Sequence, residues 1–575
     1  MATTTPSAFA AVKQAKPTAQ ILSQVRPVVR WIGVFCVVAV LGYLVLTPLA
    51  RLQSKSFANG ASGYRRAYTD SRFPSTLGYT VGLALGSLAI ALVLGTLLAW
   101  AASRLPHRLR ILRVLPILPI VVPAIASVIG WAFLLSPRPG YLNALLRKLP
   151  WWSDLTQGPI DIYTMPWIVI ITGFGLTAFV YLFVSSGFAN ISAEHIEAAQ
   201  VAGSSQWGVF FRVTLPLLRP TLIYGGGVAL LLGLGQFTGP LLLGRTAGIN
   251  VITTDIYRQM AQTPIEYGVA AALGSPLLMF GIGIVLIQKF LLGDQRRFVT
   301  HGGKAFKSEG RPSKLGALAL VLYSFIATVL PVAALIAVSM TKFWSAKIDV
   351  SKWSLVNFRK IFDQSGITSA IRNSVTMSLL AVLISIPIGF IAANLLLRGR
   401  KYKVLRTLLD FIVSLPLGVP AVVFGAGFLL TYTREPFVLY GTRWVIVLVY
   451  VTLMLPFTVR MQASAMVALG DGYVEAARVS GSGVIGTNVK IVLPLMRSAL
   501  GGAAALMFVL LTHEFAASLL VRSSTTQVMG TVLYDYWGNG TYPLVAAIAL
   551  IMTAVTTIGV VIAVMIGGSD ALSRL

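Results

Sequence analysis

Long apolar runs alternate with short polar stretches along the whole chain. Each run is close to the roughly 20 residues that an α-helix needs to cross the hydrocarbon core of a membrane. The runs fall into two sets of six, one before residue 300 and one after it, so the pattern predicts twelve membrane spans. The predicted spans are 31–50, 76–102, 114–136, 166–188, 218–243, 267–292, 315–340, 372–397, 407–431, 443–460, 496–521 and 543–567.

The composition supports a membrane protein. Of the 575 residues, 56% are hydrophobic and only 11% are charged, whereas soluble domains carry about 25% charged residues. The single cysteine, Cys36, excludes an intrachain disulfide, and the four histidines are scattered along the chain. We therefore expect an all-α integral membrane protein with no metal site and no cofactor.

The net charge of +28 would suggest nucleic-acid binding in a soluble chain. Here the basic residues lie between apolar runs, where they contact lipid head groups and set orientation, so we expect no nucleic-acid partner. The basic stretches 104–113, 289–314 and 398–406 fall on one side of the membrane, together with both termini, which predicts that this side is cytoplasmic. The opposite loops 51–75 and 341–371 are also basic, so the asymmetry is incomplete.

The two halves of the chain repeat each other in sequence. The stretch beginning Leu118-Pro119 recurs at Leu415-Pro416, an offset of 415 − 118 = 297, whereas later blocks recur at an offset of 278. The difference of 19 residues is expected to enlarge an outer loop of the first half, around Trp151. An even number of spans in each copy keeps the copies parallel. The expected organisation is a cytoplasmic tail (1–30), a first repeat (31–292), a basic cytoplasmic linker (293–314) and a second repeat (315–575).

One polar stretch recurs between the fourth and fifth spans of both copies. We expect a short helix that begins after Ser192 in copy one and after Asp471 in copy two, because both residue types are good N-caps. Glycines can end such helices in a left-handed conformation, and prolines would begin the next helix. The shared residues are Glu197, Ala198, Ala199, Gly203 and Pro216 in copy one and Glu475, Ala476, Ala477, Gly481 and Pro494 in copy two.

This repeated stretch resembles the cytoplasmic coupling loop of ATP-binding-cassette (ABC) importer permeases, with the pattern Glu-Ala-Ala-x3-Gly-x9-Ile-x-Leu-Pro. Val213 in place of isoleucine is the only departure. The resemblance implies about 12 transmembrane helices in two tandem six-helix repeats of the type I ABC importer permease (MetI-like) fold. It also implies that each short helix sits in a groove of an ATPase subunit. A plain surface loop repeated by duplication is the alternative interpretation.

The same resemblance implies partners and a location. We expect two copies of an ABC ATPase subunit, a periplasmic or lipoprotein substrate-binding protein, and the bacterial inner membrane. The chain has no G-x-x-x-x-G-K-[ST] phosphate loop, since His301-Gly-Gly-Lys304 lacks the first glycine and the final hydroxyl residue. It is therefore expected to be a transport subunit, not an enzyme, with no catalytic residues and with ATP hydrolysed by its partners.

The substrate is suggested by a stretch after the second coupling loop. There, Glu514-Phe-x-x-Ser-Leu-Leu is most similar to the ferric iron importers, while related fused permeases serve thiamine, aminophosphonates and polyamines. An ionisable residue inside a span is costly and suggests function. Glu514, its counterpart Gln236 and the neighbouring His513 are therefore candidates for the substrate pathway. Alternatively, Glu514 pairs with a helix end or with His513 and holds the fifth span in place.

Proline pairs in the third span of each half leave carbonyl groups without partners and suggest either hinges or packing kinks. A major-facilitator secondary transporter would also have six plus six spans and a basic linker. However, such a transporter would have no reason to repeat a Glu-Ala-Ala loop between spans four and five. The prolines concerned are Pro119, Pro123, Pro416 and Pro420.

Overall fold

The computed structural model describes residues 18–189, 191–292, 314–399 and 402–567. The part of the predicted tail before residue 18 and nearly all of the predicted linker lie outside these ranges. Over the described residues the chain is helical, with no β-strand. The first helix already begins at Thr18, inside the predicted tail, and continues through the first predicted span.

In the first half, most helices follow the predicted spans, and short helices fill the connections. The α-helices are α1 (Thr18–Thr69), α2 (Phe73–Ser103), α3 (Leu118–Val121), α4 (Ala124–Leu135), α5 (Tyr141–Leu146), α6 (Met165–Ala189), α7 (Ala193–Val201), α8 (Gln206–Val209), α9 (Leu215–Leu217), α10 (Arg219–Leu234), α11 (Ile252–Ala261) and α12 (Tyr267–Leu292). The 3₁₀ and π segments are η1 (His107–Ile117), η2 (Pro150–Trp152), η3 (Phe210–Thr214), η4 (Pro240–Gly244) and η5 (Arg245–Ala247).

The second half repeats this order. Its α-helices are α13 (Lys314–Ser324), α14 (Leu330–Ser339), α15 (Val356–Asp363), α16 (Ser365–Arg398), α17 (Lys403–Gly418), α18 (Ala421–Tyr432), α19 (Arg443–Leu469), α20 (Gly472–Val479), α21 (Val484–Thr487), α22 (Leu493–Leu495), α23 (Arg497–Thr512), α24 (Ala516–Val521), α25 (Met529–Gly538) and α26 (Tyr542–Gly567). The other segments are η7 (Phe325–Val329), η8 (Val350–Lys352) and η9 (Asn488–Val492).

The twelve predicted spans correspond to eight long helices and four broken ones in the described part of the chain. Eight helices are long and apolar enough to cross a membrane, and four bent pairs bring the number to twelve if each pair is one span. The third spans bend by 91° and 111°, and the fifth spans by 72° in both halves. The bends therefore recur at equivalent positions, as expected for two copies of one domain.

Proline explains the break in each third span. Val122 and Val419 are extended, and Pro123 and Pro420 follow as the non-helical N-cap residues directly before α4 and α18. A residue before proline avoids the helical region, and the missing N–H cannot continue the ladder of hydrogen bonds. The other two prolines of the predicted hinges lie within the preceding helical segments. That these bends act as hinges stays a prediction.

The two halves are interlocked by their first spans. The first span of each half packs against the broken third span of the other half: α1 lies against α18, and α14 lies against α4. A Cβ added to Gly130 would lie 2.5 Å from the carbonyl oxygen of Pro331, and one added to Gly427 would lie 2.7 Å from that of Pro48. Glycine at these crossings therefore lets the backbones touch, in the same way on both sides of the molecule.

The extra residues of the first half lie in the predicted outer loop. Residues 136–164 separate α4 from α6, whereas residues 433–442 separate α18 from α19. The lengths are 29 and 10 residues, so the first loop is longer by 29 − 10 = 19. The short segments α5 and η2 fill this insertion, and the Trp151 ring is largely exposed.

Candidate functional site

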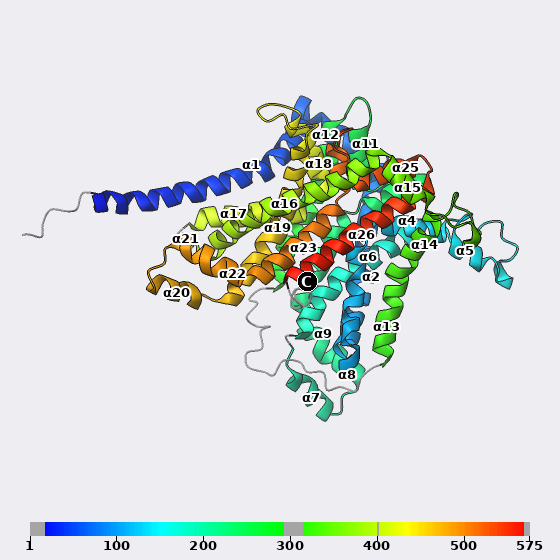
Figure 1. Cartoon of the computed structure of the whole chain (residues 1–575), viewed down its shortest axis with the longest axis horizontal. Coiled ribbons are helices and arrows are strands. Elements are labelled where there is room, and N and C mark those ends of the chain that lie inside the picture. Colours follow the sequence, from blue (N-terminus) through cyan, green and yellow to red (C-terminus); the bar gives the residue numbers. More distant parts are fainter. Residues whose placement is uncertain (1–17, 190, 293–313, 400–401, 568–575) are drawn as a thin grey trace, which may run out of the picture.

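The repeated loops form two separate short helices, α7 and α20. Figure 1 shows them at two corners of the bundle, both on the side opposite α11 and α25. In α7, the buried Ser192 hydroxyl accepts a hydrogen bond from the Glu194 N–H at 3.3 Å, as its predicted role as N-cap requires. The helix ends where Gly203 adopts φ +82°, and the Ser204 N–H donates back to the Ala199 carbonyl at 3.0 Å.

The start of α20 differs from the prediction. The Asp471 side chain makes no capping hydrogen bond, because Asp471 itself has helical backbone angles (φ −85°, ψ −14°). Gly470, at φ +73°, makes the turn instead. The Asp471 carboxylate lies 3.9 Å from Arg398 Nε. The end of α20 matches that of α7, since Gly481 has φ +79° and the Ser482 N–H donates to the Ala477 carbonyl at 2.9 Å.

Both short helices present the same residues to solvent. The predicted contact residues Glu197 and Glu475 are exposed. Val201 and Val479, again 278 residues apart, are 89% and 90% exposed. An apolar side chain so fully exposed at matching positions in two copies indicates a surface that a partner covers. Both valines stand in the repeated motif, but the sequence alone gave no reason to assign them a role.

The prolines of the motif lie at the end of the following helical segment, not at its start as predicted. That segment runs from Gln206 to Leu217 and contains a π-turn at η3, and Pro216 lies in its last turn. The chain then bends by 72° before α10 begins. Copy two has the same arrangement, with Pro494 after the π-turn η9. A π-turn shifts the ladder of backbone bonds locally, which lets a proline follow without ending the helix at once.

If the repeated loops dock an ATPase, as the resemblance implies, Gly203→Ala and Gly481→Ala are each expected to lower ATP-dependent uptake several-fold. A left-handed conformation costs an L-residue about 1–2 kcal/mol, whereas asparagine tolerates it better. Asparagine at the same positions should therefore retain most of the activity. The measurement is uptake into proteoliposomes, with Gly175→Ala as the control, because Gly175 lies within a helix and has open space around it. Equal activity of the alanine and wild-type proteins would show that the helix ends carry no function.

Glu514 lies at the break between α23 and α24 and caps α24. Its carboxylate accepts hydrogen bonds from the Ala517 N–H (2.7 Å), the Ser518 N–H (2.9 Å) and the Ser518 hydroxyl (2.5 Å). The Tyr450 hydroxyl is 2.9 Å from the same Ser518 oxygen. These contacts agree with the interpretation that Glu514 pairs with a helix end. A role in contacting substrate stays a prediction.

The side chains of the other two pathway candidates, His513 and Gln236, make no hydrogen bond to Glu514, Ser518 or Tyr450 among the described residues. The His513 Nε2 atom is buried and has no hydrogen-bond partner among the described residues. In the first half, Gln236 is half-buried, and its backbone carbonyl accepts a hydrogen bond from the Thr253 hydroxyl at 2.5 Å. Pro240 takes the place of the Ser518 hydroxyl in this copy, so the two halves are not equivalent here.

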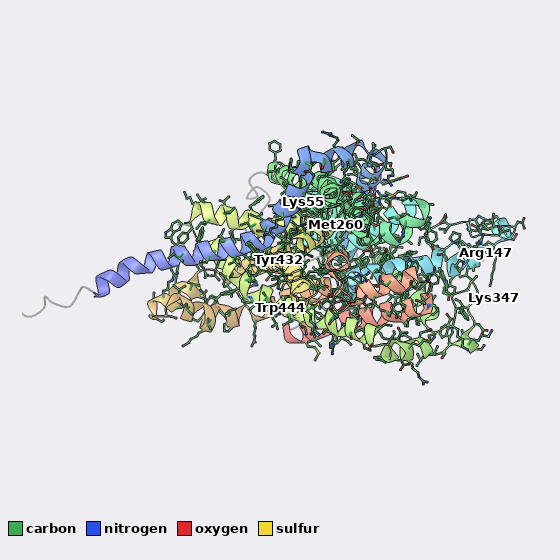
Figure 2. The ribbon with its side chains drawn as sticks, turned by 90° about the horizontal axis from the view of Figure 1, so that it is seen from above. Lys55, Arg147, Met260, Lys347, Tyr432 and Trp444 are labelled. Carbon is green, nitrogen blue, oxygen red and sulfur yellow. The ribbon has the colours of Figure 1, made fainter. Side chains whose placement is uncertain are left out.

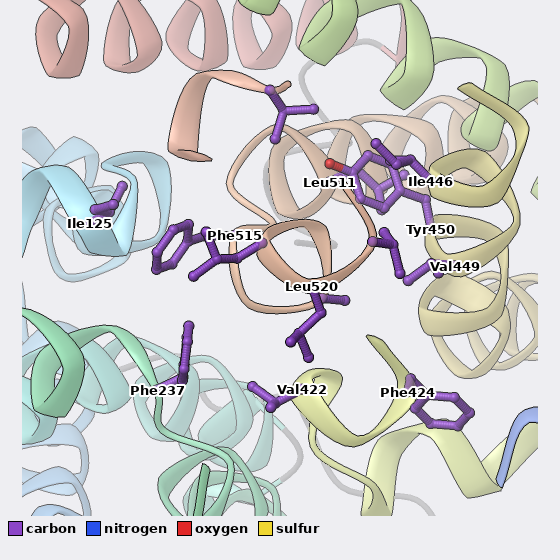
Figure 3. Close-up of a cluster of buried hydrophobic side chains, with 14 of the residues drawn as sticks. Ile125, Phe237, Val422, Phe424, Ile446, Val449, Tyr450, Leu511, Phe515 and Leu520 are labelled. Carbon is purple, nitrogen blue, oxygen red and sulfur yellow. The ribbon is translucent and has the colours of Figure 1, made fainter. Parts of the chain in front are cut away.

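Four aromatic rings meet between the halves, directly beside these candidates. The rings of Phe237 and Phe515 are 5.6 Å apart, and those of Tyr257 and Tyr534 are 6.3 Å apart. Each phenylalanine also contacts the tyrosine of its own half. Figure 3 shows Phe237 and Ile125 of the first half facing Phe515 of the second. The sequence did not predict this cluster, although Phe237 and Phe515 lie at the offset of 278.

The family comparison now identifies the chain. Residues 81–297 and 385–568 each match the family described as binding-protein-dependent transport system inner membrane component. The two matches together cover well over half of the chain. The chain belongs to this family. It is therefore a permease of the inner membrane with two fused copies of the family domain, as predicted, and the secondary-transporter alternative is set aside.

Individual relatives agree with this assignment. The permease is 24% identical over 474 residues to the ferric transport system permease protein FbpB of Actinobacillus pleuropneumoniae, covering 81% of this chain and 67% of that protein. It is also 24% identical to the probable ABC transporter permease protein y4fN of Sinorhizobium fredii, covering 88% and 90%. The sulfate transport system permease protein CysW of Synechococcus elongatus is 26% identical, over 44% of this chain and 85% of that protein.

The face of the permease opposite the short helices carries charged loops. Figure 2 shows Arg147 and Lys347 projecting at the same end of the molecule. Within this face, hydrogen bonds from Arg72 hold the pKa of the Asp70 carboxyl at about 2, so Asp70 stays ionised at any physiological pH. The described residues contain no cluster of three or more histidine, cysteine, aspartate or glutamate side chains that could hold a metal ion.

Proposed function

We propose that this permease carries ferric iron and is driven by two copies of a separate ATPase subunit. The observation that supports the ATPase contacts is the pair of equivalent exposed helices, α7 and α20, on one side of the bundle. A chain with two such helices offers one docking site to each of two ATPase copies, so a homodimer of the permease is not expected. With no phosphate loop of its own, the permease leaves ATP hydrolysis to these partners.

The side of the bundle that carries α7 and α20 is assigned to the cytoplasm, together with both termini. The basic stretches between spans support this orientation, because Lys and Arg favour cytoplasmic loops. The opposite side then receives substrate from the binding protein on which this transport family depends. Its exposed basic residues, such as Lys347, suit an acidic face on that protein.

The substrate pathway runs between the two halves, and the four aromatic rings of Phe237, Tyr257, Phe515 and Tyr534 close it. Closure of the ATPase pair on ATP would move α7 and α20, and through the bent fifth spans it would separate the rings. Gln236 and Glu514 immediately precede the two phenylalanines, so a movement that parts the rings also moves these polar residues. The hydrogen bonds that Glu514 makes to α24 transmit the motion to that helix.

Ferric iron is supported by the relative named as a ferric transport system permease protein, whose match covers 81% of this chain. A lone carboxylate is a weak site for a trivalent cation. We therefore expect iron to pass quickly, or with a chelating anion, instead of binding tightly near Glu514. An aminophosphonate, thiamine or a polyamine is the alternative cargo for the same permease.

The test is uptake into vesicles that contain the purified permease, its ATPase and its binding protein. The labelled candidates are ⁵⁵Fe(III), thiamine, an aminophosphonate, a polyamine and sulfate. The proposal predicts ATP-dependent accumulation of iron and of none of the others. ATP-driven uptake of a different compound would reject iron alone, whereas uptake that needs a proton gradient and no ATPase would reject the ATPase partnership as well.

A further inference from the structure

An apolar groove of about 680 Å³ opens on the first half of the permease, between α2, α10 and α12. Its volume lies within the range of about 300–1,000 Å³ that is typical of small-molecule sites. The lining is almost entirely aliphatic and aromatic, and Gln288 is the main polar residue. The Gln288 amide nitrogen donates to the Ile223 carbonyl at 3.0 Å and to the Tyr224 carbonyl at 3.5 Å, so its donors are directed at the backbone of α10 and not at an occupant.

The second half is filled where the first half is hollow. Leu230 lines the groove, and its counterpart at the offset of 278 is Phe508. The Phe508 ring packs into a notch at Gly559, where an added Cβ would lie 2.4 Å from the ring. The helices α12 and α26 can be aligned at their first residues, Tyr267 and Tyr542. In this alignment Ile284 of the first half is the counterpart of Gly559. The first half therefore has neither the aromatic ring nor the glycine notch that pack together at this place in the second half.

The groove lies beside the segment that follows the coupling helix α7. Phe210, Phe211 and Leu215 of that segment form part of its wall. At the same end, exposed Arg212 directly follows Phe211, and exposed Arg219 lies one turn before Leu222 on α10. Residues three apart share a helix face. An apolar cleft in the membrane region is thus combined with two cations near one end.

The same end has aromatic residues typical of a membrane interface. The Trp207 ring is 55% exposed and lies 4.9 Å from the Trp100 ring. The Arg104 guanidinium stacks over Trp100 at 4.9 Å and donates to the Gln206 side chain at 2.7 Å. Tryptophan is enriched at the level of lipid head groups, which places this end of the groove at the membrane surface.

From these features we infer that the groove holds one acyl chain of an anionic phospholipid, with its head group beside Arg212 and Arg219. The occupant is a lipid because the lining is apolar and because Val93 and Ile287, which belong to it, are exposed on the outer surface of the membrane-spanning helices. It is anionic because the cations lie at the end where a head group would stand. The bound lipid fills the space between α2, α10 and α12 and packs against the segment that joins α7 to the fifth span.

The test is to purify the full-length permease from membranes in mild detergent and count the phospholipids that it retains by native mass spectrometry. The wild-type protein should retain one lipid, with phosphatidylglycerol preferred over phosphatidylcholine at least five-fold. Leu97→Trp should fill the groove and lower retention at least five-fold. Its matched control is Ile391→Trp, because Ile391 is the counterpart of Leu97 in the second half. The two residues are 294 positions apart, as are Gly95 and Gly389, which are both closely packed against a neighbouring helix.

A second pair of variants tests the head-group contact without changing the cleft. Arg219→Gln should abolish the preference for phosphatidylglycerol, whereas Arg497→Gln, its counterpart in the second half, should leave the preference unchanged. The inference is rejected if the wild-type protein retains no lipid, or if it retains both lipids equally. It is also rejected if Leu97→Trp and Ile391→Trp retain as much as the wild type. The number and type of lipid that the wild-type protein retains can reject the inference without any variant. A variant that fails to fold therefore does not make the test inconclusive.

Discussion

Replacing Glu197 and Glu475 together with alanine is expected to reduce ATP-dependent uptake about 100-fold or more. Each glutamate is exposed on a short helix that we assign to an ATPase groove. A hydrogen bond to a charged group contributes about 1.5–3 kcal/mol, and every 1.4 kcal/mol is about tenfold in binding. Two lost contacts therefore suffice to uncouple the permease. Each single variant should show an intermediate loss, because one docking site stays intact.

The matched control is Glu194→Ala. Glu194 is exposed on the same helix as Glu197, but its counterpart in copy two is Gly472, so the motif does not repeat it. Uptake by this variant should stay close to that of the wild type. Exposed substitutions change stability by no more than about 0.5 kcal/mol, so the melting temperature of the double variant should also be unchanged. Normal uptake by the double variant would contradict the assignment of α7 and α20.

Glu514→Ala is expected to destabilise the permease by about 3 kcal/mol or more. Three donors on Ala517 and Ser518 would lose their acceptor in the interior, at roughly 1–3 kcal/mol for each unsatisfied group. The fully buried Tyr450, whose hydroxyl contacts Ser518, would also lose part of its network. The measurement is the free energy of unfolding in detergent, together with the yield of monodisperse protein.

Gln236→Ala is the comparison that separates structure from substrate contact. The Gln236 side chain makes no hydrogen bond with the described residues, so its loss should change the unfolding free energy by less than about 1 kcal/mol. A cap function predicts a large loss of stability for Glu514→Ala and a small one for Gln236→Ala. If Glu514→Ala instead melts like the wild type but loses uptake, the carboxylate acts on the substrate and the cap is dispensable.

The sequence predicted the parts of the fold that depend on local chemistry. Twelve apolar runs, the left-handed glycines at 203 and 481, and the longer outer loop all follow from residue type, length and repetition. The breaks in the third spans could not be separated from simple kinks, because proline permits both. A break differs from a kink in how the third span packs against the first span of the other half. This packing joins residues such as Gly130 and Pro331, which are about 200 positions apart in the sequence, so no local pattern reveals it.

In the candidate site, too, the sequence predicted some features and missed others. The repeat of Glu197 at Glu475 is visible in the sequence because both copies keep the motif. Asp471 was wrongly expected to cap α20, since the left-handed Gly470 lets the chain turn one residue earlier. The four aromatic rings were missed because Phe237 and Phe515 resemble ordinary core residues. Only the structure brings Tyr257 and Tyr534 beside them.

The central claim is that one permease chain docks two ATPase subunits, one at each short helix. The most direct test attaches a photoreactive maleimide to a single cysteine at Ala198→Cys or at Ala476→Cys, with Cys36 changed to serine. We expect each position to crosslink to the co-purified ATPase, and a protein with both cysteines to yield one permease bound to two ATPase chains. Ser153→Cys, on the exposed outer loop, should give no such product. Crosslinking from only one helix, or from neither, would contradict the account.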